Sequence, residues 1–228
     1  MPLPSAKFLT PLLLACSLFS VSCVSTKETP LASGAIVSHK SAVRMEREKP
    51  PFAAQTAGKM APAALLGAVG GVISANAMIS SGNTIVRENG VEDPANWISS
   101  ELAAAMSQKY GVRFAGSRKV TGEEPAEIAG ACAGADYALD VRTINWSFVY
   151  FPVNWATYRV IYSAKMRLID CRTGKVIAEG FHARVPEKTE QSPSYDNLVD
   201  GGAAGLKREL KIGAKESLDH FKRDILKL

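Results

Sequence analysis

The amino-acid sequence predicts an α+β fold: an antiparallel sheet, built from a three-strand meander and one or two short strands, with helices packed on one face. Two observations carry this prediction. Residues 137–185 hold three strand-like segments, and in the first two of them apolar residues alternate with polar ones, as half-buried strands require. Helical patterns precede and follow these segments, and the order of helix, strand, helix, meander and helix is typical of the α+β class.

The first two strands of the meander show the alternation most clearly. In the first strand, Tyr137, Leu139 and Val141 share one face. In the second strand, six apolar residues share one face and three basic residues the other: Tyr158, Val160, Tyr162, Ala164, Met166 and Leu168 against Arg159, Lys165 and Arg167. Both strands are therefore expected to bury one face against a layer of helices.

A turn and a closing proline define the third strand. Residues 170–175 are predicted to form the turn, with Gly174 where a positive φ is wanted. The third strand then covers residues 176–185, and Pro186 closes it. Residues 112–114 can add a short strand outside the meander.

Two helices are expected before the meander. Asp93 is typical of a helix N-cap and Pro94 of the first helical position. Apolar residues recur at helical spacing after them, and Gly111 is a suitable end for this helix. A second, short helix is expected at about residues 124–131.

A helix of about 25 residues is expected after Pro193. Its apolar residues fall at three- and four-residue steps, and basic residues cover much of the rest: Leu206, Leu210, Ala214, Leu218, Phe221, Ile225 and Leu228 against Lys207, Arg208, Lys211, Lys215, Lys222 and Arg223. A basic amphipathic helix can lie on anionic lipid. Seven apolar residues in register more often form a stripe that faces a core, and we favour this interpretation.

Residues 60–92 form a separate Gly/Ala-rich segment that is predicted to be helical. Its central part is uncharged, and Gly67 and Gly71 have the GxxxG spacing that lets membrane helices approach closely. One interpretation is a membrane-embedded or self-associating helix. The other, which Asn76 and the nearby serines favour, is a small-residue helix packed on its own domain, which comprises residues 93–228.

The N-terminus has the features of an export signal. Lys7 precedes an uncharged run rich in Leu and Phe, and residues 20–23 (S-V-S-C) end in cysteine, so residues 1–22 are predicted to be a signal peptide. The tetrapeptide resembles a bacterial lipobox, with serine where leucine is usual, and this resemblance implies acylation of Cys23. Processing at Cys16, secretion without lipid, and an uncleaved anchor are the alternatives.

The residues after the acylated cysteine indicate a location and a tether. By resemblance to enterobacterial lipoproteins, the absence of aspartate at Val24 implies the outer membrane, with the body of the protein in the periplasm. Residues 23–59 contain three prolines and little periodicity, so they are predicted to be the lipidated cysteine and a flexible tether with at most one short strand. Such a tether would reach about 30 Å.

Cysteine usage agrees with an oxidising compartment. One cysteine leaves with the signal and one carries the lipid, so Cys132 and Cys171 remain, and no CxxC motif is present. A register that matches the apolar strand faces by pairing Leu139 with Ala164 brings these two cysteines level. A disulfide is therefore predicted, with two separate buried thiols as the alternative.

No motif indicates enzymatic chemistry. Hydrolase and P-loop motifs are missing, and no spacing brings a nucleophile to any of the three histidines. The net charge of +5 comes from scattered basic residues, which argues against a nucleic-acid binder. Asp136, Asp140 and Asp170 are expected to face basic residues or to cap turns rather than to bind a cation. We predict no catalytic residue, no metal and no cofactor.

Aromatic residues gather at the connection between the first two strands. Seven of the 17 aromatic residues (8 Phe, 3 Trp and 6 Tyr) fall within residues 146–162, and this connection carries no Gly or Asp turn signal. Tryptophan and tyrosine often anchor interfaces. The predicted partner-binding residues are Phe151, Trp155, Tyr150 and Trp146. Packing of the last helix or the Gly-rich segment over them is the alternative.

Several segments together resemble the assembly domain of small envelope lipoproteins: residues 101–120, A-D-Y-A-L-D-V at 135–141, M-R-L-I-D at 166–170 and T-G-K-V at 173–176. Such domains occur in curli-secretion lipoproteins, penicillin-binding-protein activators and the N-terminal part of the Tol-system propeller protein. The resemblance implies a non-enzymatic domain that positions partners. We therefore predict a lipid-anchored periplasmic protein that docks onto or assembles with another envelope component. A lipoprotein that binds lipid or a small molecule, with the Gly-rich helix and the sheet as pocket walls, is the alternative.

Overall fold

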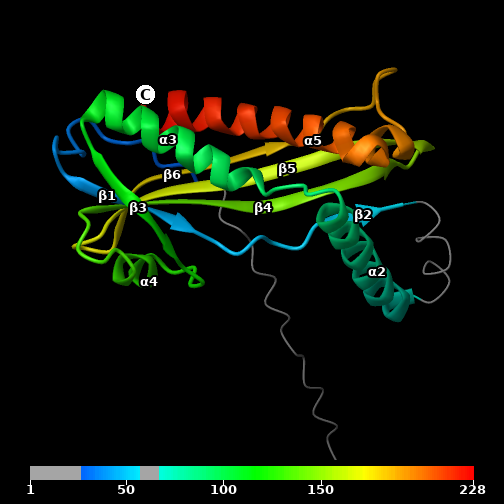
Figure 1. Ribbon diagram of the computed structural model, residues 1–228, viewed down its shortest axis with the longest axis horizontal. Coiled ribbons are helices and arrows are strands. Elements are labelled where there is room, and N and C mark those ends of the chain that lie inside the picture. Colours follow the sequence, from blue (N-terminus) through cyan, green and yellow to red (C-terminus); the bar gives the residue numbers. More distant parts are fainter. Residues whose placement is uncertain (1–26, 57–66) are drawn as a thin grey trace, which may run out of the picture.

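The structure is a computed structural model that describes residues 27–56 and 67–228, with the side chains of residues 67–74 left out. Its elements are β1 (Ser41–Glu46), β2 (Ala53–Gln55), α2 (Gly67–Glu88), α3 (Pro94–Tyr110), β3 (Arg113–Lys119), α4 (Pro125–Gly130), β4 (Tyr137–Phe151), β5 (Asn154–Asp170), β6 (Lys175–Arg184), α5 (Tyr195–His220) and the π-helical η2 (Phe221–Leu226). The α+β class is confirmed (Figure 1). The predicted signal peptide and Cys23 lie outside the described residues.

The sheet is mixed rather than purely antiparallel. Its strand order is β3-β1-β4-β5-β6, and β2 pairs with β4 beyond the end of β1. β4, β5 and β6 are antiparallel neighbours. β1 runs parallel to both β3 and β4, and β2 runs parallel to β4. β1 and β2 come from the part of the chain that was predicted to be a tether.

The prediction of a flexible tether is wrong for residues 29–55. Thr29 exchanges two backbone hydrogen bonds with Glu179 of β6, at 2.8 and 2.9 Å. Two residues later, the Leu31 N–H donates to the Ile225 carbonyl of η2 at 2.8 Å, and the Leu31 side chain is buried. β1 has only six residues and its partners are distant in sequence, so no hairpin turn marks it as a strand.

β4 and β5 form one long ribbon of 15 and 17 residues. The predicted register is wrong, because Leu139 pairs with Leu168 rather than with Ala164. A register four residues away keeps the same faces together, so the apolar pattern alone does not distinguish the two. A bulge between Thr143 and Asn145 then moves the core-facing residues of β4 from odd to even positions.

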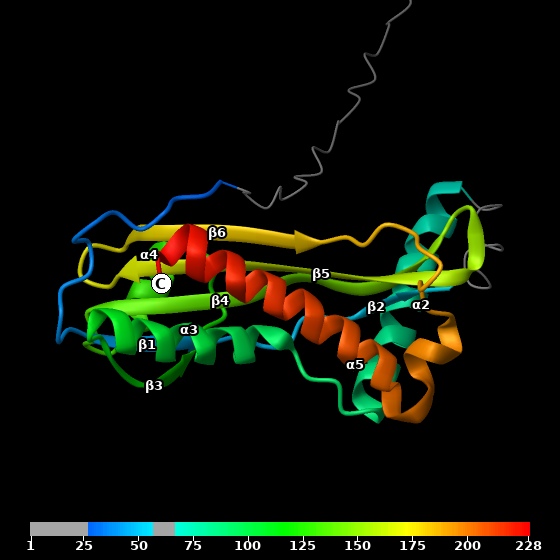
Figure 2. The ribbon, with the colours of Figure 1, turned by 90° about the horizontal axis from the view of Figure 1, so that it is seen from above.

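Two long helices, α3 and α5, cover one face of the sheet (Figures 1 and 2). Asp93 caps α3 by accepting a hydrogen bond from the Ala95 N–H, and Gly111 ends it with φ +67°. In α5 and η2 the stripe Leu206, Leu210, Ala214, Leu218, Phe221 and Ile225 is buried, which confirms the core-facing interpretation. A Cβ at Gly180 would lie 2.6 Å from Ile225 Cγ1, so this glycine lets η2 lie directly on β6.

The opposite face of the sheet carries the short helix α4, so helices are not confined to one face (Figure 1). Its Ile128 is fully buried in a second, smaller core with Val43, Ala138 and Ile169. A short helix between β3 and β4 was predicted correctly, but the prediction that the helices pack on one face of the sheet is wrong, because α4 buries Ile128 on the opposite face. β4 has buried residues on both faces, so the expectation that it buries a single apolar face does not hold for this strand.

Helix α2 projects from the sheet near the β4–β5 turn (Figure 1). Its C-terminal part packs on β2, where a Cβ at Gly82 would lie 2.1 Å from the Phe52 carbonyl oxygen, and Asn83 Oδ1 accepts the Phe52 N–H at 2.9 Å. Ile79, one turn earlier, is 37% exposed. The interpretation that the Gly/Ala-rich helix packs on its own domain therefore holds for the C-terminal end of α2. Within the described residues, no helix has the length and apolar character needed to cross a membrane.

Candidate docking site at the β4–β5 turn

The turn between β4 and β5 is tight. β4 ends at Phe151 and β5 begins at Asn154, so only Pro152 and Val153 connect them. A short turn was not predicted here, because the connection contains neither Gly nor Asp. Proline fixes its own φ, and Asn154 Oδ1 accepts the Ala156 N–H at 3.1 Å, so side chains stabilise a turn that lacks glycine.

Two apolar side chains are exposed at this turn. Val153 is 85% exposed and Trp155 is 62% exposed. The Trp155 indole N–H donates to the Pro152 carbonyl at 3.0 Å, and its ring lies 6.1 Å from the half-buried ring of Tyr150. We call Tyr150, Val153 and Trp155 the ribbon tip. Val153 was not among the predicted contact residues. Its position as an apolar β-branched residue directly after the turn proline could have indicated its exposure.

The prediction that Phe151 is an exposed contact residue is wrong. Its side chain is only 5% exposed, and the Arg159 guanidinium lies 5.3 Å from its ring. The reason is the irregular pairing at the end of the ribbon, where a bulge separates Tyr150 from Phe151 and turns Phe151 inward. Phe151 therefore packs inside the fold and supports the neighbouring tip residues.

Trp146 is also buried, at 2% exposure, so it does not form part of a contact surface. Its indole N–H donates to the carbonyls of Pro50 and Pro51 at 3.0 and 3.1 Å. Its ring meets Phe52 edge to face at 5.1 Å. The residues that cover Trp146 belong to the β1–β2 connection. This connection was predicted to be part of a flexible tether, so the burial of Trp146 was not predicted.

The middle of the ribbon thus carries an internal aromatic cluster. Phe148, Tyr158 and Tyr195 lie within 5.7 to 6.1 Å of one another, ring centre to ring centre. Tyr195 is the first residue of α5, and the N-terminal end of this helix is held to β5 where the Tyr158 N–H donates to the Pro193 carbonyl at 2.8 Å. The alternative prediction, that the last helix covers the aromatic residues, holds for this cluster but not for the tip.

The charged residues of the opposite face are paired. Asp140 is 1% exposed and accepts hydrogen bonds from Arg47 at 2.6 and 3.0 Å and from Arg167 at 2.8 and 3.2 Å. Asp136 accepts from the Ser41 N–H at 2.9 Å, and Asp170 from the Thr173 N–H at 2.9 Å. These backbone hydrogen bonds lower the pKa of Asp136 to about 2 and also lower the pKa of Asp170. The three aspartates therefore bind basic groups and turns, as predicted.

A polar cavity of about 240 Å³ lies beside this network, lined in part by Asp93, Arg142 and Thr143. Burial raises the pKa of the Asp93 carboxyl, which accepts hydrogen bonds from Thr143 Oγ1 and from the Ala95 N–H. The Ala95 N–H bond is a helix cap. The Thr143 side chain is buried and its hydroxyl also lies 3.2 Å from the Tyr162 hydroxyl, so the contact between Asp93 and Thr143 belongs to an internal polar cluster. In residues 27–56 and 67–228, no group of His, Cys, Asp and Glu side chains could hold a metal ion.

A serine–histidine pair lies under the end of α5 but is not arranged for catalysis. His182 Nδ1 lies 3.0 Å from Ser217 Oγ. Ser217 is fully buried and its hydroxyl donates to the Gly213 carbonyl at 2.9 Å, which leaves its oxygen inaccessible to a substrate. Burial lowers the pKa of His182. The pair therefore joins β6 to α5.

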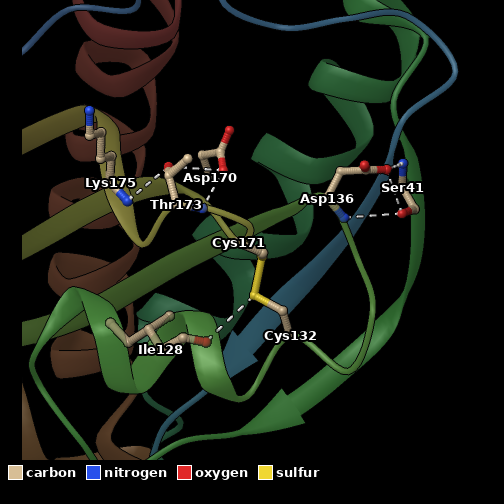
Figure 3. The surroundings of a disulfide bond; sticks show 8 residues. All are labelled: Ser41, Ile128, Cys132, Asp136, Asp170, Cys171, Thr173 and Lys175. Atoms are coloured by element: carbon tan, nitrogen blue, oxygen red, sulfur yellow. Dashed lines mark hydrogen bonds between the residues drawn. A yellow bond between two sulfur atoms is a disulfide. The ribbon is translucent and has the colours of Figure 1, made fainter.

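The other end of the ribbon is closed by a disulfide. Cys132 and Cys171 are bonded, with an S–S distance of 2.06 Å and a Cα–Cα distance of 6.2 Å, which confirms the predicted bond (Figure 3). The predicted register does not produce it. Instead, the Cys171 N–H donates to the Asp136 carbonyl, and the loop after α4 brings Cys132 back to this point.

Comparisons with known proteins found no matching family model and no matching curated protein. Solved structures that align with this chain include the lipoprotein GNA1162 from Neisseria meningitidis, with 14% identity, a TM-score of 0.29, and coverage of 81% of this chain and 99% of that one. The PelC dodecamer from Paraburkholderia phytofirmans aligns with 13% identity and a TM-score of 0.34, covering 84% and 94%. The LpoB C-terminal domain from Salmonella enterica aligns with 12% identity and a TM-score of 0.28, covering 68% and 88%.

One of these neighbours, GNA1162, is named as a lipoprotein, the class of protein that the sequence resembles. The TM-scores of all three neighbours are below 0.5, so the proposals below rest on the residues of this chain.

Proposed function

We propose that this protein is a non-enzymatic, lipid-anchored protein of the bacterial outer membrane that docks onto another envelope protein through the ribbon tip. Cys23 would carry the lipid and hold the body on the periplasmic side. Trp155, Val153 and Tyr150 would contact the partner. The observation that carries the proposal is the exposure of Val153 and Trp155, 85% and 62%, side by side at the end of the ribbon.

The tip has the properties of a small binding anchor. Interface hot spots are rich in tryptophan and tyrosine, which bury a large area on contact. Pro152 stiffens the turn, and the hydrogen bond from the Trp155 indole to the Pro152 carbonyl holds the ring in place. A side chain that is already ordered loses less conformational entropy when a partner binds. Buried Phe151 fixes the strand beneath it.

The alternative, a carrier of lipid or a small molecule, requires α2 and the sheet to enclose a pocket. α2 packs on the three-residue strand β2 through its C-terminal part, and Ala75, Asn76 and Ile79 are exposed. The described part of α2 therefore does not form a wall over the sheet. The aromatic core of the ribbon is filled by Phe52 and by side chains from β4, β5 and α5.

Benzoylphenylalanine, a photo-crosslinking amino acid that keeps a large aromatic side chain at position 155, tests the docking proposal. In cells that express the full chain at native level, we expect a discrete crosslinked protein, and Val153→Ser should weaken it. Matched controls carry the crosslinker at Val37 or Val185, which are 54% and 48% exposed away from the tip. The same products from all three positions, or none from position 155, would contradict docking through the tip.

A separate test addresses the anchor. Replacing Cys23 with alanine should release the protein into the soluble periplasmic fraction, because the acyl chains would be lost. If the variant still fractionates with membranes in high salt, an attachment other than the Cys23 lipid holds the protein.

A further inference from the structure

The link between Cys23 and the folded body is short. Five residues separate Cys23 from Thr29, which is hydrogen-bonded to β6. An extended chain spans at most about 3.6 Å per residue, so Cys23 can lie no farther than about 22 Å from Thr29. An acyl anchor on Cys23 would therefore hold the body close to the bilayer surface.

The link enters the body at the C-terminal end of the helical layer. Glu28 Oε1 lies 2.7 Å from Nε2 of His220, the last residue of α5. Leu31 then bonds to Ile225 of η2. The link thus reaches the body at the β6 edge of the sheet, beside the C-terminal end of the helical layer. The ribbon tip lies toward the other end of the molecule (Figure 2).

The outer surface of α5 and η2 has an excess of positive charge. Residues 207–227 contain seven Lys or Arg and four Asp or Glu, a difference of +3. All four carboxylates are engaged in ion pairs: Glu209 and Glu216 with Arg184, Asp219 with Lys215, and Asp224 with Arg223. Of the seven basic residues in this range, five have no carboxylate partner among the described residues: Lys207, Arg208, Lys211, Lys222 and Lys227.

An apolar groove opens on the same surface. It has a volume of about 380 Å³, lies between α5 and residues 90–97, and is lined by Val91, Pro94 and Leu210 among others. Lys207 and Lys211, one helical turn apart, lie at its edge together with Glu92 and with Trp97, which is 39% exposed. The two lysines outnumber the single carboxylate, so the lining keeps a positive charge. Tryptophan next to lysine is typical of surfaces that rest at the membrane–water boundary.

We propose that the outer face of α3 and α5 rests on an anionic phospholipid surface, with Lys207 and Lys211 against lipid phosphates and Trp97 at the depth of the headgroups. This inference rests on the proposed anchor at Cys23, which would bring this end of the helical layer close to the bilayer. The apolar stripe of α5 stays in the core, so the contact is electrostatic and interfacial rather than inserted. The ribbon tip would then extend along the membrane, free to meet a partner.

Vesicle binding of the mature chain with Cys23→Ala tests the surface without the anchor. We expect sedimentation with vesicles of phosphatidylglycerol and phosphatidylcholine, weaker binding to phosphatidylcholine alone, and a loss of binding at high salt. The variant Lys207→Glu/Arg208→Glu/Lys211→Glu should bind phosphatidylglycerol vesicles at least about tenfold more weakly. All three residues are exposed, so the fold should persist, and circular dichroism checks this.

The matched control reverses three exposed basic residues elsewhere: Arg118→Glu/Lys119→Glu/Lys175→Glu. It makes the same change in net charge and should bind as the parent does. Equal losses in both variants, or no binding to anionic vesicles by the parent, would overturn the proposal. Excess glycerol 3-phosphate should not displace the protein, and displacement would assign the lysines to a soluble phosphate ester instead. Crosslinking from position 155 is independent of these results, so failure here leaves docking to its own test.

Discussion

The two ends of the β4–β5 ribbon contrast in how their side chains are covered. At the end near Asp170, a disulfide, α4 and the Asp140 ion-pair network cover the strands. At the turn end, Val153 and Trp155 are exposed beyond the helices. Aromatic residues occur along the whole distal half of the ribbon, so composition does not separate a stabilising region from a binding region. The difference comes from the segments that pack over each part.

Two tryptophans make the contrast specific. Trp146 and Trp155 lie on paired strands of one ribbon, yet their exposures are 2% and 62%. The prolines at 50 and 51 and the ring of Phe52 cover Trp146, and its indole N–H is bonded to backbone carbonyls. Trp155 bonds only to the carbonyl of its own turn among the hydrogen bonds of the described residues. The same residue type is thus core in one place and surface in the other.

The largest expected effect comes from the covered tryptophan. Trp146→Ala should lower the free energy of unfolding by about 3–5 kcal/mol, because it removes a buried ring and leaves two carbonyls without their donor. Chemical denaturation monitored by circular dichroism measures this. A loss below about 1 kcal/mol would mean that the 50–52 segment does not pack on the ribbon in solution.

Whether a structural feature could be predicted from the sequence depends on how far apart in the sequence its interacting residues lie. The caps of α3, the turn at Gly174 and the core stripe of α5 depend on residues within a few positions, and all three were predicted correctly. The pairing of β1 and β2 with β4 joins residues about 95 positions apart, and no local pattern specifies it. The covered state of Trp146 depends on that pairing.

The exposure of the candidate site was predicted in part for the same reason. Of the four predicted contact residues, Trp155 is exposed and Tyr150 is half-buried, whereas Phe151 and Trp146 are buried. Contact of Trp155 and Tyr150 with a partner stays a prediction. The inward turn of Phe151 depends on a bulge in the strand pairing, which shifts one residue relative to its neighbours. The disulfide was predicted correctly from compartment and cysteine count, although the register argument for it was wrong by four residues.

The covered end of the ribbon should also lose stability when its disulfide is removed. Cys132→Ala/Cys171→Ala opens a loop of about 40 residues and should lower the free energy of unfolding by about 2–4 kcal/mol. Thiol labelling of the unfolded, unreduced mature chain should find neither cysteine free. If both sites are labelled in protein isolated from the periplasm, the covered end is not crosslinked in the cell.

A smaller, pH-dependent effect is expected from Asp136, which lies beside this disulfide. Its pKa of about 2 is below the unfolded value of 3.8, so its charged form stabilises the fold above about pH 4, and this stabilisation is lost as the pH falls toward 2. Because the side chain is 37% exposed, solvent screening limits the effect to at most about 1 kcal/mol. Asp136→Asn should be less stable than the parent at neutral pH, and the two should converge in acid. A constant difference across pH 2 to 6 would assign the loss to packing instead.

The smallest expected effect belongs to the exposed tryptophan and completes the comparison. Trp155→Ser removes a ring that is 62% exposed, together with one hydrogen bond to the turn, so the free energy of unfolding should change by no more than about 0.5 kcal/mol. Phe151→Ser is the matched control from the same turn: its ring is 5% exposed, and its loss should cost about 3 kcal/mol or more. Denaturation curves give the stabilities, and crosslinking yield from a probe at position 153 gives partner contact in cells. A docking anchor requires Trp155→Ser to reduce the crosslink while stability is unchanged. If Trp155→Ser instead destabilises the protein as much as Phe151→Ser does, Trp155 is held by the fold, and both of these aromatic residues belong to the core.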